Sequence, residues 1–179
     1  MNSEDVGPLV RAGRKRLLFE PTTLQALRLG RDEIERLLHH REPFLLLDEI
    51  TAVDNLKFAA AGARRIDPAD PILRGHFPHQ AIYPGVLLLE IIGQLGLCLL
   101  ALLETNGRAP DALGSTPRQV RILKIHHALF LAEVRPRDEL VVLVKIVDSD
   151  EYTAVCAGQI VKGRTICAFA VMEVYFVDR

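Results

Sequence analysis

The stretch Gly75–Gln94, GHFPHQAIYPGVLLLEIIGQ, decides how this chain folds and points to a chemistry. A histidine in a proline-containing loop, His76, precedes a Pro84-Gly85 step and a long apolar run that carries one carboxylate, Glu90. A single acid inside so apolar a run costs stability unless it is paired or has a function. The segment therefore favours an enzyme over a purely structural protein.

The apolar run after the Pro-Gly step covers residues 86–104. Roughly 19 apolar residues would just span a bilayer, so a transmembrane helix is one interpretation. Glu90 and Gln94 lie inside the run and, four residues apart, share one helix face. Gly93 and Gly96 lower helix propensity, which indicates close packing against strands rather than lipid. Because a helix that is apolar on all sides is otherwise buried in a globular fold, the pattern predicts a central helix covered by sheet and no membrane span.

Three groups in this segment suit the removal of a proton next to a carbonyl. A histidine titrates near neutrality, so His76 suits a proton acceptor. Glu90, in apolar surroundings, is expected to have a raised pKa and to donate a proton. Pro84 fits a helix start, Gly85 allows close approach of a ligand, and the free N–H groups there would polarise a carbonyl oxygen. Together they would take the α proton of a thioester and expel a β-hydroxyl.

Each of these residues also has a structural explanation. His76 alone, before Phe77, is typical of a loop histidine with a satisfied hydrogen bond. Glu90 alone would fit a buried acid paired with an arginine. Their order, with the Pro-Gly step between them, favours a site.

The composition fits a single domain of 179 residues with a formal net charge of −1. That charge, the absence of Trp and an aromatic share of 6% argue against nucleic acid or an anionic membrane as a partner. The three cysteines have neither metal-site spacing nor a disulfide framework, and His76 with His79 lacks a third ligand, so no metal is predicted. Residues 1–30 contain no continuous apolar segment of a secretory signal, so the cytoplasm is the expected location.

Two parts of the chain are distinguished by pattern. Residues 1–29 are predicted to be an N-terminal extension, mobile or partly helical, and residues 30–179 the domain. Apolar residues at helical spacing predict a short helix over residues 31–40. Strands are predicted over residues 44–53, 57–66, 119–127, 139–147, 153–161 and 165–176. One long helix followed by successive antiparallel strands is an α+β arrangement.

The quoted motifs resemble the active-site region of the hot-dog-fold 3-hydroxyacyl-(acyl-carrier-protein) dehydratases of the FabZ type. That family carries a GHFP loop, a PGV step and a V-L-x-x-E-x-x-x-Q helix, found here at residues 75–78, 84–86 and 86–94. A second block, LLHHREPFLLLDEI at residues 37–50, is similar to the family's L-L-P-H-R-Y-P-F-L-L-V-D. A weaker third block, ALFLAEVRPRDEL at residues 128–140, is similar to A-R-F-x-x-P-V-x-P-G-D. The matches keep the family's order over about residues 31–177.

The resemblance implies a hot-dog fold, in which the antiparallel sheet wraps the central helix, and a dehydratase without a cofactor. It implies that His76 takes the α proton, Glu90 protonates the departing hydroxyl and the Gly85 amide holds the thioester carbonyl. His40 is implied to take a structural part near the site. Residues expected to bind substrate are Gly85, Phe77, Pro84, Val86, Gln94 and Phe130, the last bordering the acyl tunnel.

The resemblance also implies partners. The family acts as a homodimer with the histidine and the acid from different subunits, and some members form trimers of dimers. Its substrates are carried on acyl carrier protein, which basic surface near the third block would meet. The third block departs from the family pattern here: Leu129 and Ala132 stand at commonly basic positions, Glu133 replaces Pro, and Arg137 replaces Gly. The second block also departs from it, with His39 in place of Pro and Glu42 in place of Tyr. These changes leave coenzyme A as an alternative carrier and motivate the hypothesis of a specialised lipid or polyketide pathway.

Two other functions remain open from the sequence. A hot-dog thioesterase would need a carboxylate placed to activate water, and the order of the GHFP loop and Glu90 argues against it. A non-catalytic thioester-binding or assembly subunit is compatible with the altered third block, but the presence of both His76 and Glu90 argues against that. Acyl-chain length is not predicted, because tunnel depth depends on side chains spread over the helix and sheet.

Overall fold

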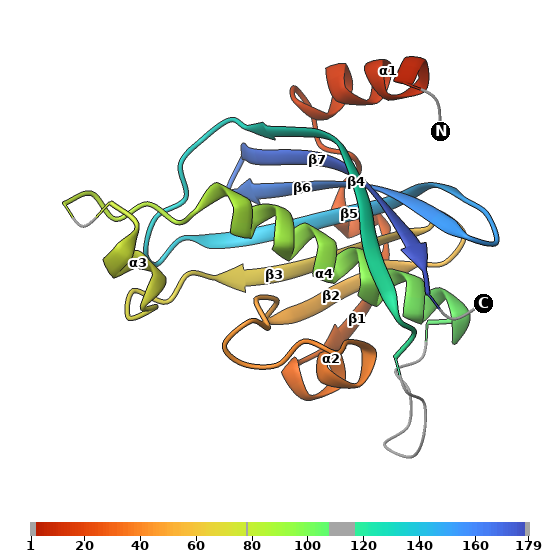
Figure 1. Ribbon diagram of the computed structural model, residues 1–179, viewed down its shortest axis with the longest axis horizontal. Coiled ribbons are helices and arrows are strands. Elements are labelled where there is room, and N and C mark those ends of the chain that lie inside the picture. Colours follow the sequence, from red (N-terminus) through yellow and green to blue (C-terminus); the bar gives the residue numbers. More distant parts are fainter. Residues whose placement is uncertain (1–2, 78, 108–116, 178–179) are drawn as a thin grey trace.

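A seven-stranded antiparallel sheet wraps one long helix in the computed structural model, which describes residues 3–77, 79–107 and 117–177 (Figure 1). The strand order is β1-β2-β3-β5-β6-β7-β4. The strands are β1 (Gln25–Leu29), β2 (Glu49–Asp54), β3 (Ala59–Arg65), β4 (Val120–Phe130), β5 (Glu139–Ser149), β6 (Thr153–Lys162) and β7 (Thr165–Phe176). The helices are α1 (Ser3–Gly13), α2 (Arg31–Leu37), α3 (Ile72–Gly75) and α4 (Gly85–Glu104), with a 3-10 turn at Pro21–Thr23.

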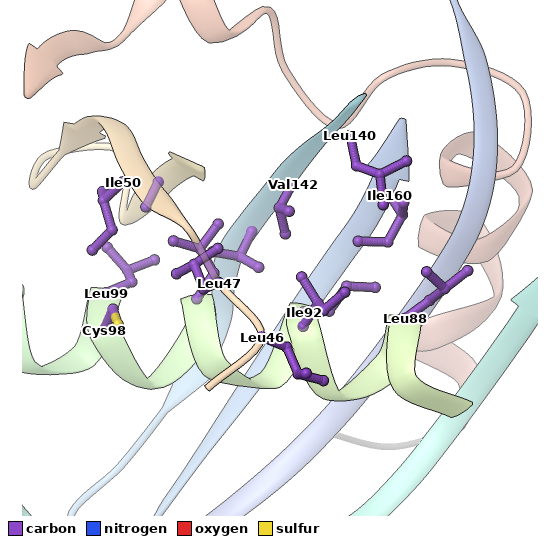
Figure 2. Close-up of a cluster of buried hydrophobic side chains, with 14 of the residues drawn as sticks. Leu46, Leu47, Ile50, Leu88, Ile92, Cys98, Leu99, Leu140, Val142 and Ile160 are labelled. Carbon is purple, nitrogen blue, oxygen red and sulfur yellow. The ribbon is translucent and has the colours of Figure 1, made fainter. Parts of the chain in front are cut away.

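The predicted central helix is confirmed as α4, which crosses one face of the sheet and packs on β3, β5, β6 and β7 (Figure 1). Its buried side chains meet those of the strands in the cluster drawn in Figure 2, where Ile92 and Leu99 are fully buried. Each such side chain contributes roughly 1.5–3 kcal/mol to stability. A Cβ at Gly158 of β6 would lie 2.1 Å from Ile92 Cγ2, so glycine lets the helix approach the strand. α4 is long and apolar enough to cross a membrane, but here it is the core helix of the fold.

Alternate residues of β7 face opposite sides of the sheet. Ala168 and Ala170 belong to the cluster that includes α4. Phe169 and Val171 belong to a separate buried cluster with Val6 of α1. The chain before β1 therefore covers the face of the sheet opposite α4.

The predicted extension, residues 1–29, makes specific contacts over its described part. The fully buried amide of Gln159 on β6 accepts a hydrogen bond from Leu18 N–H at 2.8 Å and donates to the carbonyls of Gly13 and Arg16 at 2.5 and 2.9 Å. β1 adds an edge strand to the sheet by pairing with β2. Residues 25–29 therefore lie in the sheet, although the sequence pattern assigns them to the extension. The sequence pattern did not predict this strand because it has only five residues and just one of them is buried, so it lacks a clear alternation of apolar and polar residues. Its pairing with β2 is a contact between separate segments.

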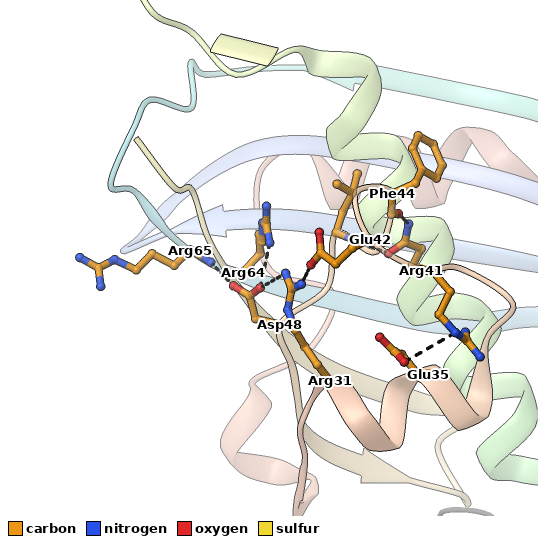
Figure 3. A network of polar contacts seen from close by, with 10 residues as sticks. Arg31, Glu35, Arg41, Glu42, Phe44, Asp48, Arg64 and Arg65 are labelled. Carbon is orange, nitrogen blue, oxygen red and sulfur yellow. Dashed lines mark hydrogen bonds and ion pairs between the residues drawn. The ribbon is translucent and has the colours of Figure 1, made fainter. Parts of the chain in front are cut away.

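The predicted strand over residues 44–53 is wrong at its start, since β2 begins at Glu49. A polar network fixes the preceding segment instead (Figure 3). Asp48 accepts hydrogen bonds from the guanidinium groups of Arg31 and Arg64 at 2.9 and 2.8 Å and from Arg65 N–H at 2.7 Å. Arg31 also pairs with Glu42. Residues 41–48 are therefore an ordered irregular segment, called here the 41–48 loop, that lies against α4.

Candidate active site

Glu90 lies in the second turn of α4 and shares one oxygen between two neighbours. Gln94, one turn later, donates from Nε2 to Glu90 Oε1 at 2.9 Å. His40 Nε2 lies 3.4 Å from the same oxygen, and the two side chains are about equally exposed, at 26% and 30%. Both neighbours engage Oε1, so Oε2 is the oxygen left for a substrate.

Gln94 links Glu90 to the 41–48 loop. Its Oε1 accepts a hydrogen bond from Leu46 N–H at 2.8 Å, and its Nε2 donates to Phe44 O at 2.8 Å as well as to Glu90. Both amide hydrogens are thereby used, so the fully buried side chain is fixed in one orientation. These bonds replace the ladder bonds that a strand over residues 44–48 would make, which is why the loop is irregular.

The expectation of a raised pKa for Glu90 is wrong in this chain. Burial raises the pKa of the carboxyl, but the hydrogen bonds from His40 and Gln94, together with the charge of a protonated His40, lower it more. The sequence pattern showed the apolar run, but not the two donors brought to the carboxylate. Glu90 is therefore an ionised side chain at neutral pH that must acquire a proton before it can act as an acid.

A pocket of about 390 Å³ opens beside Glu90, between α4 and the strands β4, β5, β6 and β7. Gly93 and Gly96 of α4 line it, and a Cβ at Gly96 would lie 3.2 Å from Cys156 Sγ on the facing strand. Both helix glycines therefore line a pocket, and Gly96 also allows the close approach of helix and sheet that the sequence predicts. Burial raises the pKa of the Cys156 thiol to about 12, so it is protonated and apolar in character. The lining is mostly aliphatic, and besides the Cys156 thiol its charged or titratable members are Glu90, His40 and Arg121.

His76 lies immediately after α3, in a loop held by backbone bonds. Its Nδ1 is 2.8 Å from Ile82 O, and its ring lies 4.2 Å from the Phe77 ring. A carbonyl only accepts hydrogen bonds, so Nδ1 carries the proton and Nε2 is left with a lone pair. Phe77 has a φ of +54°, which is unusual for a bulky residue and is often found at functional sites.

A second pocket, of about 430 Å³, contains His76, Gly85, Val86 and Phe130. Pro84 is buried and caps α4, so that the helix starts at this pocket. A Cβ at Gly85 would lie 2.9 Å from the Phe130 ring, so any larger residue would collide with that ring. The first N–H groups of α4 have no intrahelical acceptor by geometry and suit an oxygen ligand.

The structure groups the predicted site residues into two sets. Gln94 bonds to Glu90 from behind the first pocket and does not line it, whereas Gly85, Phe77 and Phe130 lie with His76 at or beside the second. Val86 lines both pockets and is 68% exposed. Within one chain, His76 does not line the pocket that contains Glu90.

Sequence reasoning missed the contact of His40 with Glu90. The sequence assigned His40 only a structural part, from its place in the second motif block. Nothing local relates residues 40 and 90, so only that shared motif offered a signal. Among the described residues, no group of three His, Cys, Asp or Glu side chains is arranged to hold a metal ion.

Comparisons with known proteins identify the family of this chain. The FabA-like domain model matches residues 38–170. The chain is 31% identical to the 3-hydroxyacyl-(acyl-carrier-protein) dehydratase FabZ of Campylobacter curvus, over 82% of this chain and 97% of that protein. It is 34% identical to FabZ of Macrococcus caseolyticus, over 66% of this chain and 74% of that protein.

Solved structures agree on the fold. The dehydratase heterocomplex ApeI:P from Xenorhabdus doucetiae superposes with a TM-score of 0.64 at 15% identity, covering 82% of this chain and 91% of that one. A mutant thioesterase from Pseudomonas aeruginosa gives a TM-score of 0.57 at 14% identity, covering 86% and 98%. The fold is thus the α+β hot-dog fold, as predicted. The chain belongs to the FabA-like family of hot-dog-fold proteins and, within it, to the FabZ 3-hydroxyacyl-(acyl-carrier-protein) dehydratases, which are hydro-lyases.

Proposed function

We propose that this protein dehydrates a 3-hydroxyacyl thioester to the trans-2-enoyl thioester in fatty-acid or related specialised lipid or polyketide biosynthesis. The observation that carries the proposal is Glu90, set in the wall of an otherwise mostly aliphatic pocket of about 390 Å³. A pocket of this kind suits an acyl chain, and the carboxyl within it suits the β-hydroxyl. The names of the FabZ relatives support acyl carrier protein as the carrier, and the cytoplasm is the proposed location.

In this proposal His76 is the base and Glu90 the acid. His76 Nε2 takes the Cα proton, the Cα–H electron pair forms the double bond, and the Cβ–O bond breaks as Glu90 protonates the departing oxygen to give water. The hydrogen bond of His76 Nδ1 to Ile82 O supports this role, because it holds the ring with Nε2 free. The Gly85 amide would hold the thioester carbonyl and stabilise the charge that develops there.

The separation of His76 from Glu90 supports a site completed by a second copy of the chain. β4 is an edge strand of the sheet and exposes Ile122, Leu123 and Ile125, by 57%, 55% and 48%. Exposed apolar edges are typical of strands that pair with another chain. We propose a homodimer in which His76 of one subunit meets Glu90 of the other, with a trimer of dimers as a larger assembly.

A thioesterase is the second candidate, and one observation favours it. The lowered pKa of Glu90 would give a carboxylate ready to activate water, and a thioesterase is among the structures with the same fold. A thioesterase would release a free thiol, however, and would give His76 no Cα proton to abstract. A non-catalytic thioester-binding subunit would do neither.

Mass spectrometry of the purified full chain with 3-hydroxyacyl thioesters on acyl carrier protein and on coenzyme A tests the proposal. We expect loss of one water with the thioester intact, faster on the preferred carrier. Release of free thiol without water loss would support the thioesterase, and an unchanged substrate bound to the protein would support the non-catalytic subunit. The comparison of the two carriers decides whether the altered third block has changed the partner.

Gly93→Leu is expected to shorten the acyl chain that the protein accepts. The leucine would extend from α4 into the pocket, because a Cβ at this position already lies 3.9 Å from Met172 Cε on the far wall. We expect turnover of 3-hydroxydodecanoyl thioester to fall by about 10-fold or more relative to 3-hydroxybutyryl thioester. Gly93→Ala should change the same ratio less. Equal losses on both substrates would show that this pocket does not hold the acyl chain.

A further inference from the structure

His40 occupies a position between two pockets. It lines the pocket of about 390 Å³ that contains Glu90 and also a smaller pocket of about 100 Å³ behind it. Leu97, Leu100 and Val120 line both pockets as well, so these side chains and His40 form the partition. Among the described residues, the imidazole is the one titratable group common to the two linings.

The two ring nitrogens of His40 have different surroundings. Nε2 lies 3.4 Å from Glu90 Oε1, while Nδ1 is buried without a hydrogen-bond partner among the described residues. Buried ring nitrogens are rarely left unpaired, and the smaller pocket that the His40 side chain lines has room for water molecules. The ring is held in place by Phe44, whose ring stacks on it with centroids 6.2 Å apart.

Glu90 needs a source of protons that the sites described above do not supply. Its pKa is lowered chiefly by the hydrogen bonds from His40 and Gln94, which outweigh the effect of burial. Gln94 has no proton to give, since an amide does not ionise near neutrality. An imidazole does ionise in this range and already points at the carboxylate.

We propose that His40 supplies Glu90 with the proton it delivers in each turnover, taking that proton up at Nδ1 from the smaller pocket and passing it on from Nε2. The inference rests on the proposed dehydratase function. The proton balance closes: elimination moves the Cα proton to His76 and the Glu90 proton to the departing oxygen. A solvent proton arriving through His40 then restores Glu90, while His76 returns its proton to solvent. His40 acts through Glu90 and is therefore a positioning and proton-supplying residue that does not touch the substrate.

The charged and titratable groups near His40 are set on several elements. α4 contributes Glu90 at one pocket and Glu104 at the other. The segment entering β4 contributes Arg118, which pairs with Glu104 at 3.1 Å, and β4 contributes Arg121. Within its own loop, His39 bonds to Pro117 O at 2.8 Å, and Arg41 donates to the His40 carbonyl at 2.7 Å. Of these groups, Glu90 is the acid in contact with the ring.

His40→Gln separates proton supply from positioning. The glutamine Nε2 can still donate to Glu90 Oε1 but cannot ionise, so the carboxylate keeps its geometry and loses its proton source. We expect kcat to fall by about 10²-fold and the pH profile of kcat to lose one ionisation. His79→Gln, at an exposed histidine that lines neither pocket, should keep the wild-type kcat and pH profile. His40→Ala should lose as much activity and regain part of it when imidazole is added.

Three outcomes decide the inference. If His40→Gln keeps the wild-type kcat and pH profile, the inference is overturned. It is also overturned if His40→Gln loses activity with an unchanged pH profile and imidazole does not rescue His40→Ala, because that combination indicates a structural role alone. A wild-type protein without water loss would instead remove the proposed function, on which the inference depends. An NMR titration of Glu90 needs no turnover: its pKa should rise in His40→Ala, which removes a hydrogen bond that lowers it, and an unchanged pKa would show that the two groups are not coupled.

Discussion

His76→Ala is expected to lower kcat for dehydration by about 10³-fold while leaving the fold and the oligomer intact. The variant removes the proposed base. The other titratable side chains among the described residues that line its pocket are Tyr83, whose pKa burial raises, and the exposed Glu133. The ring makes one hydrogen bond, to Ile82 O, and lies in a partly exposed loop, so stability should change little. Steady-state assay with the preferred carrier, with size-exclusion chromatography of the same sample, measures both.

His79→Ala is the matched control for this prediction. It removes an exposed histidine from the same loop, outside the described pockets, and should keep the wild-type rate. Near wild-type turnover in His76→Ala would show that another group abstracts the proton. His40 would then be the first histidine to examine, because it contacts Glu90.

Glu90→Gln is expected to lower kcat by a similar factor, about 10²–10⁴-fold, because an amide cannot donate the proton that the departing hydroxyl needs. The substitution keeps the size of the side chain and an oxygen that can accept from Gln94 Nε2. The fold should therefore be retained. An unchanged rate would remove Glu90 from the mechanism.

Mixing the two inactive variants tests where the site is built. If His76 and Glu90 act from different subunits, a dimer of one His76→Ala chain and one Glu90→Gln chain contains one intact site. Random exchange of subunits should then restore about a quarter of the wild-type rate. Subunits are unfolded together and refolded to allow exchange, and each variant refolded alone is the control. No recovery from a mixed dimer would place both residues in the site of one chain.

Glu90 also gives a stability prediction with a definite sign. Its pKa is lowered in the folded chain, because hydrogen bonds from His40 and Gln94 outweigh burial. A group with a lowered folded pKa stabilises the fold above its unfolded pKa and loses that contribution as pH falls through the folded value. The difference in unfolding free energy between wild type and Glu90→Gln should therefore shrink as the solution is made acidic, which denaturant titrations at several pH values would measure. A difference that grows in acid would contradict the lowered pKa.

The sequence by itself determined the fold class and most of the elements. The run over residues 86–104 is apolar nearly throughout, so it must be buried, and the strands that follow from the pattern supply the sheet that buries it. The same stretch placed Glu90 and Gln94 on one face of that helix, and their hydrogen bond confirms this spacing. These features follow from the spacing of apolar and polar residues within short segments, which can be read without knowing the tertiary contacts.

Only the tertiary structure decided the state of the site. The ionisation of Glu90 depends on His40, and the irregular 41–48 loop depends on Gln94, in each case through contacts between residues about 50 positions apart. The division of His76 and Glu90 between two pockets depends on how the loop after α3 and the body of α4 are placed around the sheet. Such contacts are set by packing and not by periodicity. The sequence pattern therefore singled out His76 and Glu90 as candidates, while the fold determined the ionisation of Glu90 and the neighbours that each residue meets.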